Sequence, residues 1–429
     1  MANPPSVRRR RADGHEPDRL SSLSDELLII ILSLLPTRMA ARTSVLSRRF
    51  QHLWKASLSV DLTANQYTNN ETFEAAASSA ILSREPSNSL LSLTLDLSYA
   101  LLPLTDDSNM PYTFLTSLLV KARSLGLRHL TIRSNFWDFH PIIPTIFSID
   151  SLESLHLPVI NSEILMAIPS NATLAQLKSL SFFWAHNSVE FNQLLSKLSS
   201  VQYLGLEMYF TRSFSLSSQT IRKLELDVLG CSKKVEFFGL SIPSLEVLVL
   251  HLEIGQCQSL PRIEGDMPFL TKAIIVLQGL HKGDVGAVDH LLNCVSNVED
   301  LSLSLDIKES AFVNEEEKYP FPVLLEPGKA VPDFPNLKHL DVKMCFHEPN
   351  LGSFIALLHH SPALESVKLV HKVPRFTGRK RTRKKKDWVS KLPRNVNGIY
   401  NYLNLGENKK ELLKLLDKNV PLLGVHITS

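Results

Sequence analysis

The chain has 429 residues, of which 44% are hydrophobic and 21% are charged, a composition typical of a folded protein with a large apolar core. Its 16 glycines are too few for Gly-rich phosphate-binding architectures or flexible linkers, and no uncharged apolar segment reaches the roughly 18 residues of a membrane span. The four cysteines lie far apart without a C-x-x-C pair, which indicates reduced core thiols in a reducing compartment.

The net charge of +3 hides an uneven distribution along the chain. Residues 1–58 carry ten basic and five acidic side chains, and residues 375–386 carry eight basic and none acidic. Residues 59–374 carry 22 basic and 34 acidic side chains, so an acidic body lies between two basic elements. Arg8 to Arg11 are followed by acidic residues and not by an apolar segment, so we expect no secretory signal and an intracellular protein.

A helical unit is predicted between residues 18 and 58. Ser24 is a good N-cap for its first helix, and the two acidic residues that follow favour the helix dipole. Pro36 ends this helix, and Thr37 can cap the next one. Eight of the nine residues from 27 to 35 are apolar, which is more apolar surface than a unit of about 40 residues can enclose. The excess must face either the rest of the chain or a separate protein.

A nearly continuous set of residues in this unit matches a known motif. The set is Asp18-Arg19-Leu20, Leu23, Asp25-Glu26-Leu27-Leu28, Ile31-Leu32-Ser33, Leu35-Pro36-Thr37, Ala40, Thr43-Ser44-Val45-Leu46-Ser47-Arg48-Arg49 and Leu53-Trp54. On these residues the segment resembles a plant F-box. It departs from the family pattern twice, with Ser24 in place of the usual proline and Phe50 in place of the usual tryptophan.

The resemblance implies that this unit binds the Skp-type adaptor of a cullin-based ubiquitin ligase. It also implies which residues supply the adaptor contact and the core of the unit, without separating the two roles: Leu20, Leu23, Leu28, Ile31, Leu32, Leu35, Pro36, Val45 and Leu46. The alternative is a helical cap that only shields the first repeat of the segment that follows.

An apolar-x-x-apolar-x-apolar pattern recurs through the rest of the chain. Its copies start at Leu90, Leu127, Leu152, Leu177, Val201, Ile221, Leu245, Leu270, Val298, Leu337 and Leu364, with weaker copies at Tyr400 and Leu422. Spacings of 20 to 25 residues between Leu127 and Leu270 fall in the range of leucine-rich repeats. One such unit cannot bury its apolar residues alone, so neighbours stack into a parallel sheet that lines a curved solenoid. The alternative is a set of scattered buried strands in an ordinary α/β domain.

The repeats resemble plant-type leucine-rich repeat arrays with imperfect units. The predicted fold class is therefore α/β, a small three-helix F-box followed by a leucine-rich repeat solenoid. The residues between the apolar positions form its concave face, which suits recognition of a target protein. The candidate target-binding residues on this face are Arg133, His156, Phe183, Tyr203, Glu207, Glu225 and Asp227.

A dense basic stretch interrupts the last repeats. It contains Arg379, Lys380, Arg381, Arg383, Lys384, Lys385 and Lys386, and such charge density predicts an exposed loop. Its interpretations are a nuclear-import signal, a solvated loop without a specific role, or a contact with nucleic acid. The import signal is favoured over the solvated loop. Nucleic-acid contact is the least favoured, because the stretch lacks interleaved aromatics and adjoins an acidic body that would repel phosphates.

The predicted domains are 1–17 (a disordered basic N-terminus), 18–58 (F-box), 59–374 (repeat array), 375–390 (basic loop) and 391–429 (C-terminal repeat and cap). No nucleotide-binding, nucleophile-elbow or zinc-protease motif is present, so we expect no cofactor, no metal and no catalytic site. The sequence favours a non-catalytic receptor subunit of an SCF (Skp–cullin–F-box) ubiquitin ligase, in the nucleus or cytoplasm and not bound to a membrane. A ligase-independent scaffold and a nuclear protein that contacts nucleic acid through residues 375–386 stay open as alternatives.

Overall fold

The computed structural model describes most of the chain between residues 19 and 371, together with one short segment near its end. The described ranges are 19–20, 22–98, 112–134, 139–160, 168–169, 174–184, 188–210, 213–231, 237–253, 263–264, 267–278, 285–306, 331–344, 354, 356–371 and 424–428. The chain divides into two compact units, residues 1–131 and residues 132–429. The predicted basic N-terminus and basic loop, and the weak repeat at Tyr400, lie outside the described residues.

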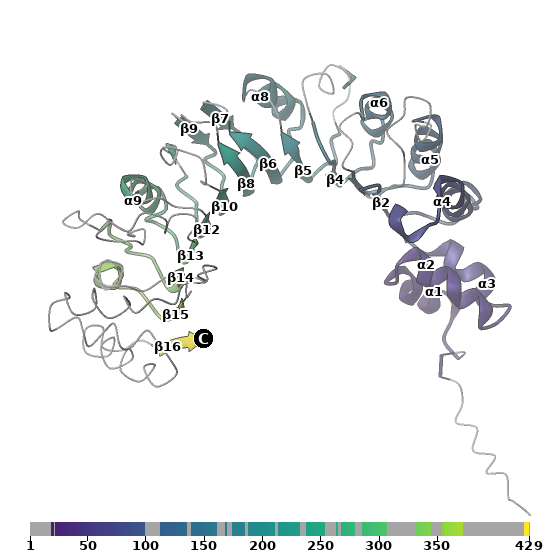
Figure 1. Ribbon diagram of the computed structural model, residues 1–429, viewed down its shortest axis with the longest axis horizontal. Helices are drawn as coiled ribbons and strands as arrows, with labels where there is room; N and C mark the ends of the chain where they lie inside the picture. The colour runs from purple at the N-terminus through teal and green to yellow at the C-terminus, as the bar shows by residue number, and fades with distance from the viewer. Residues whose placement is uncertain are drawn as a thin grey trace, which may run out of the picture. The chain divides into compact units, whose positions relative to one another are not determined.

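The first unit begins with helices and continues into parallel strands (Figure 1). Its elements are α1 (Asp25–Ser33), α2 (Thr37–Arg42), α3 (Phe50–Leu53), β1 (Ser59–Thr63), α4 (Asn70–Ala77), β2 (Ser92–Asp96), α5 (Tyr112–Ser124) and the start of β3 (His129–Arg133). β1 and β2 pair in parallel, with Val60 beside Leu93 and Leu62 beside Leu95. All four of these side chains are buried, so the strands already share a core.

The second unit contains a long parallel sheet, a small second sheet and short helices (Figure 1). Its helices are α6 (Ile143–Ile146), α8 (Ser188–Lys197) and α9 (Val285–Cys294). Its main strands are β4 (Ser154–His156), β5 (Ser179–Trp184), β6 (Tyr203–Phe210), β8 (Lys223–Cys231), β10 (Val247–Glu253), β12 (Lys272–Gln278), β13 (Asp300–Asp306), β14 (His339–Met344), β15 (Ser366–His371) and β16 (Gly424–Thr428). The second sheet contains β7 (Ser213–Ser217), β9 (Phe237–Ser241) and β11 (Ile263–Glu264).

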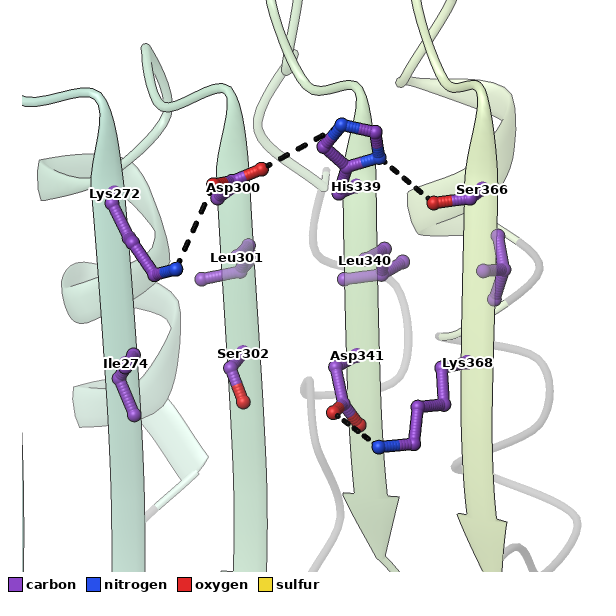
Figure 2. Close-up of a pocket in the computed structure, with 11 residues that line it drawn as sticks. Lys272, Ile274, Asp300, Leu301, Ser302, His339, Leu340, Asp341, Ser366 and Lys368 are labelled. Carbon is purple, nitrogen blue, oxygen red and sulfur yellow. Dashed lines mark hydrogen bonds and ion pairs between the residues drawn. The ribbon is translucent and has the colours of Figure 1, made fainter. Parts of the chain in front are cut away.

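The main strands of the second unit lie side by side in chain order and in parallel, from β4 to β16. Equivalent repeat positions are therefore register partners: Lys272 pairs with Asp300, and Asp300 pairs with His339 (Figure 2). Helices α8 and α9 lie on one side of this sheet (Figure 1). We use the name open face for the other side, which carries the residues between the inward apolar positions.

The apolar pattern coincides with the strands and with the core. In each of the ten copies from Leu90 to Leu337, the first, fourth and sixth residues are buried. The weak copy at Leu422 coincides with β16, which pairs in parallel with β15. The predicted α/β fold class with a parallel repeat sheet is confirmed.

A recurring pair of backbone hydrogen bonds connects successive repeats of the second unit. The carbonyl of Glu153 accepts hydrogen bonds from the N–H groups of Lys178 and Ser179, at 2.9 and 3.0 Å. In each following repeat an equivalent carbonyl accepts hydrogen bonds from two consecutive N–H groups of the next repeat. These carbonyls belong to Lys178, Gln202, Arg222, Glu246, Thr271, Glu299 and Lys338. The register of neighbouring strands is thus fixed where each strand begins.

An aromatic cluster joins β5 of the main sheet to α8 and to β7 of the second sheet. The ring centroids of Trp184 and Phe191 lie 5.2 Å apart, and those of Phe191 and Phe214 lie 5.7 Å apart. All three side chains are buried. Burial of such large side chains makes this cluster a major part of the core behind the open face.

Candidate functional site

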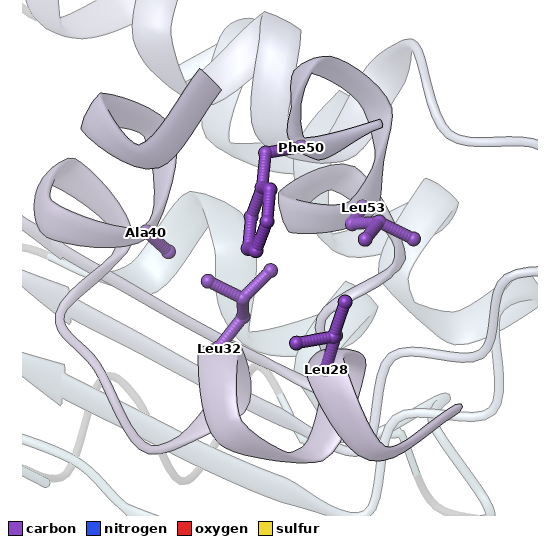
Figure 3. Packing of buried hydrophobic residues seen from close by; sticks show 5 residues of the cluster. All are labelled: Leu28, Leu32, Ala40, Phe50 and Leu53. Atoms are coloured by element: carbon purple, nitrogen blue, oxygen red, sulfur yellow. The ribbon is translucent and has the colours of Figure 1, made fainter. Parts of the chain in front are cut away.

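The helical unit has a small core of its own (Figure 3). It consists of Leu28 and Leu32 from α1, Ala40 from α2, and Phe50 and Leu53 from α3. Leu28 is fully buried and Leu32 is 2% exposed, so these two predicted residues belong to the core. Phe50 is buried among them and keeps the aromatic role expected at its position.

A second apolar face of α1 is exposed to solvent. Leu27, Ile30, Ile31 and Leu34 have the i, i+3, i+4, i+7 spacing of one helix face, and all four are exposed. Leu34 is 80% exposed, which is unusual for a leucine beside a well-packed core. Of these four residues, only Ile31 was among the predicted adaptor contacts.

Further exposed apolar residues lie in the turn after α2. Val45 is 86% exposed and Leu46 is 64% exposed, and Met39 on α2 is also exposed. Leu20 and Pro36 are exposed as well, whereas Leu23 and Leu35 are partly buried against the core. The structure thus separates the predicted set into outward residues (Leu20, Ile31, Pro36, Val45 and Leu46) and residues in or against the core (Leu23, Leu28, Leu32 and Leu35).

Polar contacts hold the helices of this unit together. The Arg49 guanidinium lies 2.6 Å from Asp25 Oδ1 and donates a second hydrogen bond, also 2.6 Å long, to the carbonyl of Leu23. Ser24 caps α1 as predicted, accepting from the Leu27 N–H at 3.5 Å. A separate hydrogen bond from the Ser24 side chain lowers the pKa of the Glu26 carboxyl. The serine therefore supports the start of α1 at the position where the family has proline.

Two hydroxyl groups connect the helices to β1. Ser33 Oγ accepts from the N–H of Leu58 at 2.8 Å, and Thr37 Oγ1 accepts from the N–H of Asp61 at 2.7 Å. The prediction that Thr37 caps α2 is wrong, because Pro36 occupies the N-cap position and the threonine side chain points to β1 instead. The helical unit thus contacts the first strand through polar bonds, while its outward apolar residues stay exposed.

The predicted target-binding residues lie on the open face of strands β3 to β8. His156 Nδ1 is 2.6 Å from Ser181 Oγ, and the pKa of His156 is lowered by burial and by the charge of Arg133. The Tyr203 hydroxyl donates to Glu225 Oε2 at 2.9 Å, and burial together with this carboxylate raises the pKa of Tyr203 to about 12. Phe183 lies beside Glu207 in the register of β5 and β6.

An excess of negative charge gathers on β6 and β8. Glu207 and Asp227 are register partners, and Glu225 follows on the same face of β8. Burial and the charge of Asp227 raise the pKa of the Glu207 carboxyl. Glu225 has Lys223 at 4.0 Å, but no cation among the described residues pairs with Glu207.

A shallow cavity of about 590 Å³ lies further along the open face, between β12 and β15 (Figure 2). Its lining includes Lys272, Ile274, His339, Asp341 and Lys368. None of these five residues belongs to the predicted target-binding set. They occupy the positions between the apolar residues of the repeats at Leu270, Leu337 and Leu364, which is the signal that could have identified them.

The described residues do not point to a metal centre or to a membrane segment. Within the described ranges, no three His, Cys, Asp or Glu side chains come close enough to hold a metal ion. No helix in that part of the chain has the length and hydropathy needed to cross a bilayer. The predicted import stretch from Arg379 to Lys386 lies outside the described residues and stays a prediction.

Fold and surfaces define a class of protein in which a helical unit with an exposed apolar face precedes a leucine-rich repeat array with a polar open face. No family model matches the chain. An F-box/LRR-repeat protein of Arabidopsis thaliana is 25% identical over 405 residues, which cover 83% of this chain and 81% of the relative. A second Arabidopsis F-box/LRR-repeat protein is 26% identical over 388 residues, covering 85% of this chain and 82% of the relative.

An Arabidopsis F-box/FBD/LRR-repeat protein is 28% identical over 259 residues, covering 58% of this chain and 57% of the relative. These relatives confirm the resemblance to plant F-box/leucine-rich repeat proteins that the N-terminal motif and the repeats predict. Their names support an F-box protein.

Proposed function

We propose that this chain is a non-catalytic substrate-recognition subunit of an SCF ubiquitin ligase. The helical unit would bind a Skp-type adaptor, and through it a cullin, while the repeat array would hold a target protein. Ubiquitin transfer would then depend on proximity, because the array raises the effective concentration of target lysines near the ubiquitin-charged enzyme.

One observation carries this proposal: the helical unit exposes an apolar surface that its own core does not need. Its five-residue core is complete without Leu34, Val45 or Leu46, and these three side chains are all more than 60% exposed. Burial of even 600 Å² of such surface contributes on the order of 15 kcal/mol before association costs, which is enough for a stable complex.

The contacts with β1 do not account for this surface. A helical cap for the repeats needs only the face that meets β1, where Ser33 and Thr37 make their hydrogen bonds. The outward stripe of Leu27, Ile31 and Leu34 on α1 stays exposed in the structure. A partner protein that covers this stripe explains why α1 is apolar on two faces.

The adaptor contact can be tested with a purified Skp-type adaptor and the full chain carrying Leu34→Asp plus Val45→Asp. Each change places a charge where an apolar side chain would become buried, so we expect the Kd measured by calorimetry to rise at least a hundredfold. Leu32→Asp is not a useful test, because Leu32 belongs to the core and the unit would unfold.

The control is Val120→Asp, which changes another exposed apolar residue, on α5 and outside the helical unit. It should leave adaptor binding unchanged. Full adaptor binding by the double variant, or equal losses in the double variant and the control, would contradict the assignment of this surface. No adaptor binding by the unmodified chain would favour the ligase-independent scaffold.

A further inference from the structure

Side chains on the open face change in character from β6 to β15. At the β6–β8 end, Glu207, Asp227 and Glu225 outnumber the single lysine, Lys223. His251 Nδ1 lies 3.9 Å from Asp227 Oδ2, and an imidazole neutralises this carboxylate only when it is protonated. This end of the face therefore presents uncompensated carboxylates.

Apolar side chains occupy the middle of the face, on β10 and β12. Val249 pairs in register with Ile274, and His251 pairs with Val276. Ile274 and Val276 are half-buried although they point away from the core side of the sheet. Such residues on an otherwise polar face provide a surface for an apolar side chain of a ligand.

Positive charge is in excess at the β14–β15 end. Lys343 Nζ and Lys368 Nζ lie 3.9 and 3.3 Å from the same atom, Asp341 Oδ2, so two ammonium groups share one carboxylate. The Lys368 side chain lines the 590 Å³ cavity together with Ile274 and Ser302 (Figure 2). A carboxylate brought into this cavity would find an ammonium group that Asp341 satisfies only partly.

The same order of chemistry recurs on two neighbouring rows of the sheet. The rows are Glu225–Val249–Ile274–Ser302–Asp341–Lys368 and Asp227–His251–Val276–Ser304–Lys343. With strands about 4.8 Å apart, Asp227 and Glu207 lie five and six strands away from Lys368, a separation of roughly 24 to 29 Å. An extended polypeptide rises about 3.3 Å per residue, so about seven to nine residues span this distance.

From this arrangement we propose that the open face binds an extended segment of a target protein laid across the strands. A Lys or Arg of the segment would lie against Glu207 and Asp227, an apolar side chain would lie over Ile274 and Val276, and an Asp or Glu about seven to nine residues from the cation would meet Lys368. This inference rests on the proposed function in that the array is taken to recognise a protein. It adds the charge order and the spacing of the segment.

The segment can be identified with a phage-displayed library of random 12-residue peptides selected on the full chain. Enriched peptides should contain a Lys or Arg and an Asp or Glu about seven to nine positions apart, with an apolar residue between them. Enrichment without this charge order, or no enrichment at all, would overturn the proposal.

Variants assign the two ends separately, with a synthetic copy of the most enriched peptide as the probe. Glu207→Gln plus Asp227→Asn should raise the Kd of this peptide about tenfold, with no such effect on a copy whose basic residue is replaced by Ser. Lys368→Gln should also raise the Kd of this peptide about tenfold, with no such effect on a copy whose acidic residue is replaced by Ser. Lys343 is left in place because Asp341 Oδ1 is buried without a hydrogen bond among the described residues, so Asp341 needs one remaining cation.

The matched control is Lys338→Gln plus Glu299→Gln. It neutralises an exposed ion pair (2.8 Å) that lies just before the strands begin, outside the two rows. Equal losses of affinity in this control and in the open-face variants would contradict the proposed site.

Failure of the adaptor proposal is recognisable separately. The Leu34→Asp plus Val45→Asp variant changes only the helical unit and should select the same peptides. If that variant keeps adaptor binding but the peptides show the charge order, the adaptor surface is wrong and the open-face site stands.

Discussion

The carboxylate of Glu207 lies in an unfavourable position for a surface charge. It lies on the exposed side of β6, where its surroundings remove part of its hydration, and its register partner on β8 is Asp227, a like charge. Both effects raise the pKa of Glu207, which means that its ionised form costs free energy in the folded state. A ligand cation would remove this cost, so the residue links the stability of the array to the proposed recognition of a basic side chain.

Glu207→Gln should therefore stabilise the chain at neutral pH. Because the pKa is raised in the folded state, the folded chain binds more protons than the unfolded chain just above pH 4.5, and stability falls as the pH rises through this window. We expect the variant to raise the Tm by about 1 °C at pH 7 and to have no effect near pH 4, as measured by differential scanning calorimetry.

A suitable control is Glu253→Gln, which neutralises an exposed carboxylate at the end of β10. At pH 7 it should raise the Tm less than Glu207→Gln does. A lower Tm for Glu207→Gln at pH 7 would show that the carboxylate is favourably paired in the folded chain.

The sequence alone does not determine which apolar residues of α1 are buried. The apolar run on α1 predicts that some side chains are in excess, but Leu27 and Leu28 are equally apolar neighbours. Only the packing of Phe50 and Leu53 against α1 decides that Leu28 is buried and Leu27 is exposed. The outward set could therefore not be predicted from residue type or helical periodicity alone.

At the scale of elements, the connection between α5 and β3 depends on one glycine. Gly126 has a φ of +81° and follows the C-cap of α5. The N–H of Leu127 bonds to the carbonyl of Ala122 at 3.2 Å, and the N–H of Gly126 bonds to that of Arg123 at 3.1 Å. This pair of bonds is a Schellman motif, which ends the helix and directs the buried Leu127 into the repeat core.

Gly126→Ala is expected to destabilise the first unit by about 1 kcal/mol, measured by urea unfolding followed by circular dichroism. The cost is one of backbone conformation only, because an added Cβ would meet no atom within 4 Å. Gly126→Asn should cost less than the alanine variant, since asparagine adopts this conformation more readily. Equal losses for the two variants would point to a steric cause and contradict this explanation.

The repeat pattern predicts some strands of the structure and misses others. The main strands with two inward apolar residues were predicted, whereas β1 was missed because the buried Ser57 stands at the first position of its pattern. Ser57 is tolerated there because its hydroxyl donates to Ser59 and contacts Ser33. The second sheet was also missed, although Leu216 on β7 and Leu240 on β9 pair in register at a repeat-like spacing.

At the scale of the whole molecule, the repeat sheet couples each strand mainly to its two neighbours. The recurring pair of backbone hydrogen bonds and the strand pairing both connect adjacent repeats only. In such a stack, stability is close to a sum of repeat and interface terms, so a change at one position propagates over short distances. The proposed adaptor surface and the open face of β6 to β15 should therefore tolerate changes independently, as the proposed receptor with two partners requires.

Deletion of residues 424–429 tests this independence. It removes β16, which pairs with β15 along residues 366–370. We expect amide hydrogen exchange, followed by mass spectrometry, to accelerate at least tenfold in β15, less in β14, and not at all in β1 and β2, because the lost interface term belongs to the last repeats. Adaptor binding should be unchanged. Faster exchange throughout the array would instead show that the repeats unfold as one cooperative body, in which case the two binding surfaces could not vary independently.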